Sequence, residues 1–317
     1  MGNSMPQKSL HFTSATGLIP HTFQNDYMFR GILQRNKIVL IGLTSSLLHI
    51  PPENITDISI ENAIQMGEDF DSKTFILDIH VLINRNMYLN LEMQVVNEQD
   101  WSDRSLSYLC RQFDNLYSGD EYSKVKGVHH VGILNFNAFK DSDEFYSTYY
   151  LMNDNQHIYS SKFRLSVLNL RQIDKATEED KEWKIDYWAR LFAAKTWEDL
   201  SMIAENDIYL SEASESLYIL NQDKIFAEQC RAREDALRRE KRNAEMMEKL
   251  LAEQERARKD AERKEKRNAE MMEKYEELKV EAEELKEETA DLKQKNDEKD
   301  REIQELKKLL MEHGIDA

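Results

Sequence analysis

Two carboxylates lie inside segments of the sequence that otherwise have the apolar character of buried strands. Between Ile76 and Gln94 the chain reads ILDIHVLINRNMYLNLEMQ, so Asp78 and Glu92 each interrupt an apolar run. A carboxylate that is removed from water is costly unless it is paired, hydrogen-bonded or bound to a metal. Each of these residues therefore needs a partner, and the partner decides the chemistry.

The polar turn at residues 84–86, NRN, predicts that the two runs pair as a β-hairpin. In that hairpin Asp78 lies across from Glu92. Gln94 follows Glu92 by two residues and shares its face, because strand side chains alternate. Two carboxylates and an amide form an oxygen-rich site, and oxygen is the ligand that Mg²⁺ prefers.

The alternative is that both carboxylates are bonded within the protein, to Lys73, Arg85 or backbone amides. His129 and His130 have no partner at a metal-ligand spacing and are expected to be ordinary strand residues. Glu61 is expected to face solvent from its short strand.

Hydrophobic patterning indicates the elements that must position these residues. Helices are expected at 25–33, 37–50 and 101–119 and as a helical pair over 178–204, and strands at 55–62, 73–83, 87–96, 128–139, 146–153 and 162–173. The helix at 101–119 opens with an acidic cap region and closes at Gly119. The sum is a mixed α/β domain from about Pro20 to Tyr218.

The composition excludes several classes of protein. The two cysteines, Cys110 and Cys230, are too few for a disulfide framework or a cysteine-rich zinc site, and this usage fits a reducing cytoplasm. The N-terminus lacks the apolar core of a secretory signal. No run of about 18 apolar residues exists that would span a membrane.

The chain changes character near Asn221, where aromatic residues nearly vanish and Glu, Lys, Arg, Ala, Met and Leu dominate. No proline follows Pro52, so a long uninterrupted helix is permitted. The net charge of −17 divides into −12 up to Asn221 and −5 beyond it. We therefore expect a flexible N-terminus over 1–19, a globular domain over 20–220 and a long charged helix over 221–317.

The last part of the tail has the pattern of a coiled-coil seam. Leu278, Leu285, Leu292 and Leu306 share one heptad position, and the partner position includes Asn296 and Ile303. A buried Asn at that position favours a parallel pair of helices, because two amides satisfy each other only when aligned. A homodimer through this seam is the expected assembly.

Further upstream the tail carries a repeat, RREKRNAEMMEK at 238–249 and RKEKRNAEMMEK at 263–274. The offset of 25 residues is close to seven helical turns, so both copies face nearly the same side. For residues 231–274 a solvated single helix and a coiled coil both remain open.

The order of Asp78, Glu92 and Gln94, then a helix and a further strand, resembles the PD-(D/E)XK nuclease superfamily. The wider context is similar to its recombination-promoting nuclease or transposase branch. That context comprises NDYMFR at 25–30, DSKTFILDI at 71–79 and VGILNF at 131–136, together with Arg104, Tyr108, Tyr117, Gly119 and Tyr122. The resemblance covers about 25–221.

The resemblance implies a restriction-endonuclease-like mixed sheet flanked by helices and metal-dependent cleavage of DNA phosphodiesters. Asp78, Glu92 and the main-chain carbonyl of Met93 would hold Mg²⁺, with Mn²⁺ as the alternative ion, and no organic cofactor or membrane is involved. Gln94 stands where most of the superfamily has Lys. An amide orients a water but cannot relay a proton.

Four further residues are candidates for the site. Asp26 matches an acidic family position, although capping the first helix is its more ordinary role. Lys73 either contacts a phosphate or pairs with Asp71. For Arg104 and Tyr108, packing and contact with a phosphate are equally open roles.

Two functions follow. The first is an Mg²⁺-dependent DNA endonuclease that the tail dimerises. The second is a catalytically weak or inactive protein that keeps the nuclease fold as a scaffold and acts through the tail. The acidic globular part disfavours DNA binding.

Overall fold

The computed structural model describes residues 11–61, 79–97, 99–113, 116, 118–139 and 142–312. Contacts divide the chain into a first unit that ends at Glu245 and a second unit that begins at Met246. Lys73, Asp78 and Tyr117 lie outside the described residues, as do residues 1–10.

The first unit is built on a mixed sheet of six described strands in the order β1-β2-β3-β4-β6-β5. The strands are β1 (Ile58–Ile60), β2 (Ile79–Ile83), β3 (Met87–Gln94), β4 (Gly127–Leu134), β5 (Tyr146–Met152) and β6 (Ile158–Asn169). β3, β4 and β6 run parallel to one another, and the remaining neighbours pair antiparallel. The mixed sheet flanked by helices confirms the predicted fold class.

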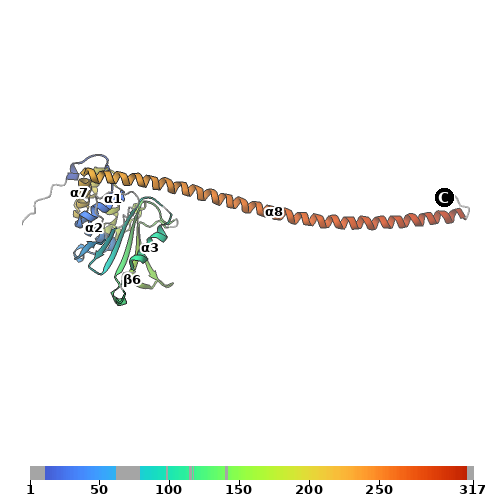
Figure 1. Cartoon of the computed structure of the whole chain (residues 1–317), viewed down its shortest axis with the longest axis horizontal. Coiled ribbons are helices and arrows are strands. Elements are labelled where there is room, and N and C mark those ends of the chain that lie inside the picture. The colour runs from blue at the N-terminus through green and yellow to red at the C-terminus, as the bar shows by residue number, and fades with distance from the viewer. Residues whose placement is uncertain are drawn as a thin grey trace, which may run out of the picture. The chain divides into compact units, whose positions relative to one another are not determined.

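Helices cover both faces of this sheet (Figure 1). The helices of the first unit are α1 (Asp26–Arg35), α2 (Lys37–Leu48), α3 (Trp101–Phe113), α4 (Glu178–Glu182), α5 (Ile185–Ala193), α6 (Trp197–Ile203), α7 (Ile208–Gln222) and the start of α8 (Lys224–Glu312). α3 packs on β4 and β6 from one side, which we call the α3 face. α1, α2, α5 and α7 build the main core on the other side, which we call the core face.

The β2–β3 hairpin forms at the predicted turn. Asn84 and Arg85 have φ values of 48° and 60°, a left-handed conformation, within the three-residue loop 84–86 that joins Ile83 to its register partner Met87. The Asn84 side chain accepts hydrogen bonds from the backbone N–H groups of Thr56 and Asp57, at 3.0 and 3.1 Å. This side chain therefore ties the hairpin to the loop before β1.

The close approach of α3 to the sheet depends on Gly132 of β4. A Cβ atom at this position would lie 2.1 Å from the Trp101 ring. Trp101 is buried and packs with Leu134, Phe136 and Val167 in a small apolar cluster of its own. Glycine at this position lets α3 lie directly against the strand that neighbours β3.

Three local details differ from the sequence prediction. The helical pair expected over 178–204 is three short helices, because Lys184 adopts a left-handed conformation (φ 59°) and Thr196 caps a new helix. α3 is described as far as Phe113, and residue 116, before Gly119, is not helical. The described part of the N-terminal segment expected to be flexible, residues 11–19, packs on the first unit, where Phe12 is buried and its N–H donates to Glu215 at 3.2 Å.

The start of α8 is part of the first unit. Phe226 packs on α1, where a Cβ on Gly31 would lie 2.3 Å from its ring. Asn25 donates a hydrogen bond to the Cys230 carbonyl at 2.8 Å, and Arg233 binds Asp26. The change in composition at 221 marks where α8 begins, whereas its packing on α1 continues to Arg233.

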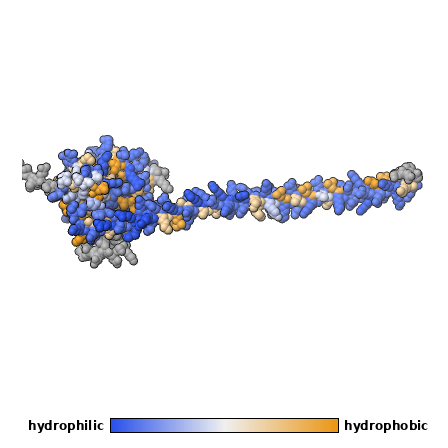
Figure 2. All heavy atoms as spheres, turned by 90° about the horizontal axis from the view of Figure 1, so that it is seen from above, coloured by the Kyte–Doolittle hydropathy of each residue, from blue (hydrophilic) through white to orange (hydrophobic). Residues whose placement is uncertain are grey.

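The second unit consists of the rest of α8. Its leucine seam is exposed along a single helix, with Leu278, Leu285, Leu292 and Leu306 each more than half accessible. Figure 2 shows apolar residues spaced along this largely hydrophilic helix. No described helix is long and apolar enough to cross a membrane.

Candidate active site

β3 presents a row of buried polar side chains to the α3 face. Asn90, Glu92 and Gln94 alternate with Leu89, Leu91 and Met93, which enter the main core. Glu92 is 5% exposed and Gln94 is 8% exposed. The predicted shared face of Glu92 and Gln94 follows from this alternation.

An arginine from α3 holds the Glu92 carboxylate. Arg104 Nη2 lies 2.8 Å from Glu92 Oε1. The Arg104 guanidinium also lies over the Tyr108 ring, 5.9 Å from its centroid. Burial of a carboxylate is costly unless a cation or hydrogen bonds compensate for the lost water, and Arg104 supplies that compensation.

The other partners that the sequence suggests for the two carboxylates are Lys73, Arg85 and backbone amides. Of these, Arg85 instead pairs with Asp57, its Nε 3.0 Å from Oδ2. Packing and phosphate contact were both open as roles for Arg104 and Tyr108. In the structure Arg104 forms an ion pair with Glu92. Glu61 is exposed and accepts a hydrogen bond from Ser59, as expected for a residue that faces solvent.

His130 is the site neighbour that sequence reasoning missed. Its side chain is fully buried on β4, and its Nε2 lies 3.7 Å from Glu92 Oε2. Its Nδ1 lies 2.7 Å from Asn90 Nδ2, and its ring stacks on Tyr108 with the centroids 6.3 Å apart. With the Asn90 nitrogen as donor, Nδ1 accepts and the ring proton faces Glu92.

The signal that could have found His130 is strand register. β3 and β4 are parallel, and Asn90 and Glu92 are the register partners of His130 and Gly132. A polar residue at alternate positions of β4 therefore meets the polar row of β3. The pairing of β3 with β4 cannot be predicted from neighbouring residues alone, because α3 separates the two strands in the sequence.

Gln94 lies at the last position of β3. Its Oε1 is buried and has no hydrogen-bond partner among the residues that the structure describes. Its backbone carbonyl accepts from Asn135 N at 3.0 Å, and the Asn135 carbonyl accepts from Arg171 Nε at 2.8 Å. Two hydrogen bonds thus connect Gln94 to an arginine at the same edge of the sheet.

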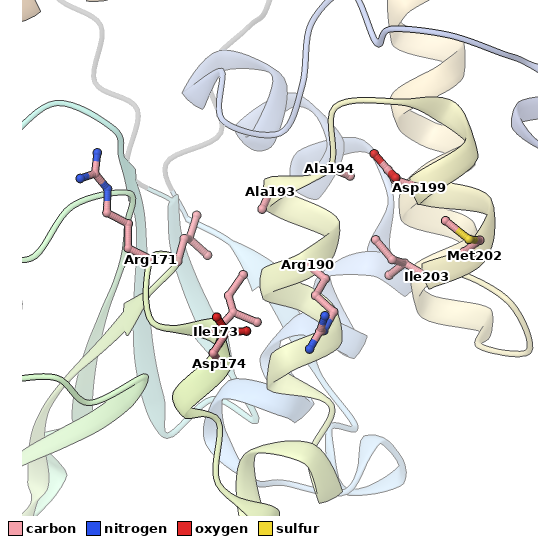
Figure 3. Close-up of a pocket in the computed structure, with 10 residues that line it drawn as sticks. Arg171, Ile173, Asp174, Arg190, Ala193, Ala194, Asp199, Met202 and Ile203 are labelled. Carbon is pink, nitrogen blue, oxygen red and sulfur yellow. The ribbon is translucent and has the colours of Figure 1, made fainter.

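An open pocket of about 430 Å³ lies at this edge, where Leu170 N bonds to Leu134 O. Its lining includes Leu170, Arg171, Asp174, Arg190 and Asp199. Figure 3 shows Asp174 and Arg190 near one another across the pocket, and Arg171 extended away from them. The pocket therefore combines apolar side chains with two arginines and two aspartates.

Asp26 is the first residue of α1 and not its cap. Asn25 is the cap of α1, with its side chain accepting from Met28 N at 3.2 Å, so the capping role expected for Asp26 is wrong. Asp26 instead binds Arg233 of α8, with Oδ2 2.6 Å from Nη2. Burial raises the pKa of Asp26 from its usual 3.8, against the effect of Arg233.

Of the metal ligands that the resemblance implies, Glu92 and Met93 are among the described residues and Asp78 is not. Asp78 directly precedes Ile79, whose register partner on β3 is Leu91, the residue before Glu92. The Met93 side chain is buried in the main core, and its main chain belongs to β3. Among the described residues no three His, Cys, Asp or Glu side chains gather closely enough to hold a metal.

The donors that β3 presents nevertheless suit a hard cation. They are oxygens, namely the carboxylate of Glu92, the buried amide oxygen of Gln94 and backbone carbonyls. A buried carboxylate beside an unsatisfied amide oxygen is an arrangement that an apolar core alone does not explain.

Comparison with known proteins agrees with this arrangement. Residues 23–247, which include the sheet, α3 and the start of α8, match the family described as PD-(D/E)XK nuclease family transposase. No curated protein and no solved structure matches the chain. The chain belongs to the PD-(D/E)XK nuclease family transposases.

Proposed function

We propose that this protein is an Mg²⁺-dependent DNA endonuclease with Asp78, Glu92 and Gln94 as its catalytic residues. The observation that carries the proposal is the buried Glu92–Gln94 pair at the end of β3, in a chain that belongs to a nuclease family. Mn²⁺ is the alternative ion. Asp78 completes the pair of carboxylates because it precedes Ile79, which pairs beside Glu92.

Asp78, Glu92 and the Met93 carbonyl would hold the ion. A bound divalent ion lowers the pKa of a water and stabilises the charge that develops on phosphorus. Gln94 orients the attacking water through Oε1, which the described protein leaves unbonded. Gln94 is neutral and cannot accept the proton.

Arg104 and His130 act as positioning residues in this proposal. Arg104 compensates for the charge of Glu92 and fixes one carboxylate oxygen at 2.8 Å. His130, held by Asn90 and stacked on Tyr108, limits the movement of the other oxygen. Preorganised carboxylates are what a metal site needs, since second-shell contacts orient the ligands.

DNA binding needs local positive charge, because the globular part carries a net charge of −12. Arg171 supplies a guanidinium group beside the strand end that carries Gln94, through its bond to the Asn135 carbonyl, and Arg190 lines the same pocket as Arg171. Guanidinium groups bind phosphate in a bidentate manner. We assign the DNA backbone to this edge of the sheet, with Lys73 as a further phosphate contact.

The second unit makes the protein a parallel homodimer in this proposal. The exposed seam from Leu278 to Leu306 would form an unprotected apolar stripe on a single helix, and a second copy buries it. Asn296 selects the parallel arrangement. Two nuclease units at the same end of the coiled coil suit cleavage of both strands of a duplex.

A second candidate function is a nuclease-fold scaffold that acts through its helical unit. The observation that favours it is Gln94 in place of the superfamily lysine, together with the acidic globular part. Under this alternative the Glu92–Arg104 pair is structural.

Cleavage of supercoiled plasmid separates the two functions. The purified protein is incubated with Mg²⁺, Mn²⁺ or EDTA, beside Asp78→Ala and Glu92→Ala, with Asp57→Ala, in the loop before β1, as a matched control. Nicking that needs the ion, is lost in both site variants and persists in the control supports the endonuclease. Equal nicking by all variants indicates a contaminant, and no nicking under any condition favours the scaffold.

A further inference from the structure

A second, separate cavity lies on the core face of the sheet. Its volume is about 330 Å³, and it lies between the end of α2, the strands β4, β5 and β6, and the start of α4. Its polar lining includes His49, His129, Tyr146, Tyr150, Arg164 and Glu179. His129 directly precedes His130 on β4, so the two imidazoles point to opposite faces and this cavity is distinct from the Glu92 site.

His129 presents a nitrogen that the protein does not satisfy. The residue is 3% exposed, and its Nε2 lies 2.6 Å from Ser166 Oγ. Its Nδ1 is buried and has no hydrogen-bond partner among the described residues. Burial lowers the pKa of His129 to about 3, with the Arg164 charge as the next cause, so the ring is neutral.

His49 presents a second such nitrogen. It caps α2 in a left-handed conformation with φ of 54° and stacks on Trp183, with centroids 5.2 Å apart and planes 6° apart. Its Nδ1 lies 3.3 Å from Glu179 Oε1. Its Nε2 is buried without a partner in the described part of the chain. A buried polar atom left unsatisfied is costly, and two of them in one cavity indicate a missing partner.

Among the described residues that line the cavity, Arg164 is the one with a full positive charge. Its Nε donates to the Ser161 carbonyl at 3.0 Å, and its guanidinium lies over the Tyr150 ring, 5.8 Å from the centroid. It forms no ion pair with any residue that the structure describes. The terminal nitrogens of Arg164 therefore offer a fork for an oxyanion.

Two carboxylates in the wall limit the charge of that oxyanion. Asp180 is engaged by Thr177 in a capping box, and Glu179 lies beside His49. A phosphate dianion adds two negative charges beside these two acids and one guanidinium, whereas a carboxylate adds one, so the repulsion is stronger for phosphate. A carboxylate is the group that suits Arg164, and a hydroxyl or ammonium group suits His49 and Glu179.

We propose that this cavity binds a small organic carboxylate that also carries a hydrogen-bond donor, such as a 2-hydroxy acid or an amino acid. The carboxylate binds the Arg164 guanidinium, the donor group faces His49 and Glu179, and a polar atom of the ligand bonds to His129. Tyr146 and Tyr150 form the walls. The volume lies at the lower end of the range for small-molecule pockets, which fits a ligand of this size.

A binding experiment on the full chain tests this assignment. The probes are the L-amino acids, glycolate, L-lactate and mandelate, first by thermal shift and then by titration calorimetry. The methyl ester of each binder removes the oxyanion, and inorganic phosphate tests the alternative anion. The variants are Arg164→Gln, Arg164→Lys, which keeps the charge without the fork, and Arg85→Gln as an exposed control arginine.

We expect at least one probe to raise the melting temperature and to bind saturably. Arg164→Gln should weaken that binding about tenfold or more, Arg164→Lys should weaken it less, and Arg85→Gln should leave it unchanged. Circular dichroism confirms that each variant is folded. The proposal is overturned if no probe binds at up to about 20 mM, if the esters bind as well as the acids, if phosphate binds more tightly than every carboxylate, or if folded Arg164→Gln retains full affinity.

Discussion

At the scale of single residues, Glu92 and His129 illustrate two ways to keep an ionisable group buried. Glu92 remains beside a cation, Arg104, at 2.8 Å. His129 is neutral, because burial lowers its pKa to about 3 and the neighbouring charge of Arg164 acts in the same direction. The first arrangement pairs a carboxylate with a cation, and the second preserves an uncharged hydrogen-bonding ring.

The depressed pKa of His129 makes folding stability depend on pH. Between the folded pKa of about 3 and the unfolded value of 6.5, the unfolded chain binds the proton and the folded chain does not. The contribution of His129 is therefore complete above pH 6.5 and declines as the pH falls towards 3. His129→Gln should remove this dependence.

The measurement is the free energy of unfolding in urea at pH 7.5 and pH 4.5. From the higher to the lower pH, the wild type should lose about 2 kcal/mol more than His129→Gln. His157→Gln is the control, because His157 is exposed. Equal losses in the wild type and His129→Gln would contradict the assigned pKa.

Gln94 gives a second prediction at this scale. If its amide only orients the water, Gln94→Lys should keep or raise the rate of plasmid cleavage, since lysine is the usual superfamily residue and reaches as far. The rate is measured at saturating Mg²⁺ beside a check of the fold. Complete loss of cleavage in a folded Gln94→Lys protein would show that the site depends on an amide.

At the scale of elements, the hairpin and the helices α1 and α2 could be predicted because their signals are local. Alternation placed Glu92 and Gln94 on one face, and the turn at 84–86 fixed the pairing of β2 with β3. The partners of Glu92 could not be predicted. Arg104 and His130 reach it through the packing of α3 and the parallel register of β4, which local patterns do not contain.

The start of α8 shows the same limit. The composition of this segment predicts a helix, but it does not predict which residues of the helix pack against another element. Phe226 and Cys230 are buried, whereas the neighbouring Ile225 is 68% exposed. The packing on Gly31 and the ion pair with Asp26 identify this segment as part of the first unit.

This packing predicts unequal effects of two neighbouring substitutions. Phe226→Ala should lower the free energy of unfolding by about 3–5 kcal/mol, because it leaves a void against α1. Ile225→Ala should change it by less than about 0.5 kcal/mol. Urea denaturation measures both, and equal effects would mean that the start of α8 does not pack on α1.

At the scale of the whole molecule, the proposed homodimer depends on the leucine seam of the second unit. Deletion of the residues after Lys274 should convert a dimer into a monomer by light scattering. The circular dichroism of the first unit should persist. Because two active sites are then no longer held together, nicking should be favoured over double-strand breaks. A full-length protein that is already monomeric at tens of micromolar would contradict the coiled-coil dimer.

We propose that the Glu92 carboxylate holds the metal ion on which cleavage of DNA depends. The most direct measurement is the initial rate of plasmid cleavage by Glu92→Gln relative to the wild type, at saturating Mg²⁺ and with matched circular dichroism. Glutamine keeps the shape of the side chain and removes its charge. We expect a rate at least about 100-fold lower than that of the wild type. An unchanged rate in a folded variant would rule out this role for Glu92.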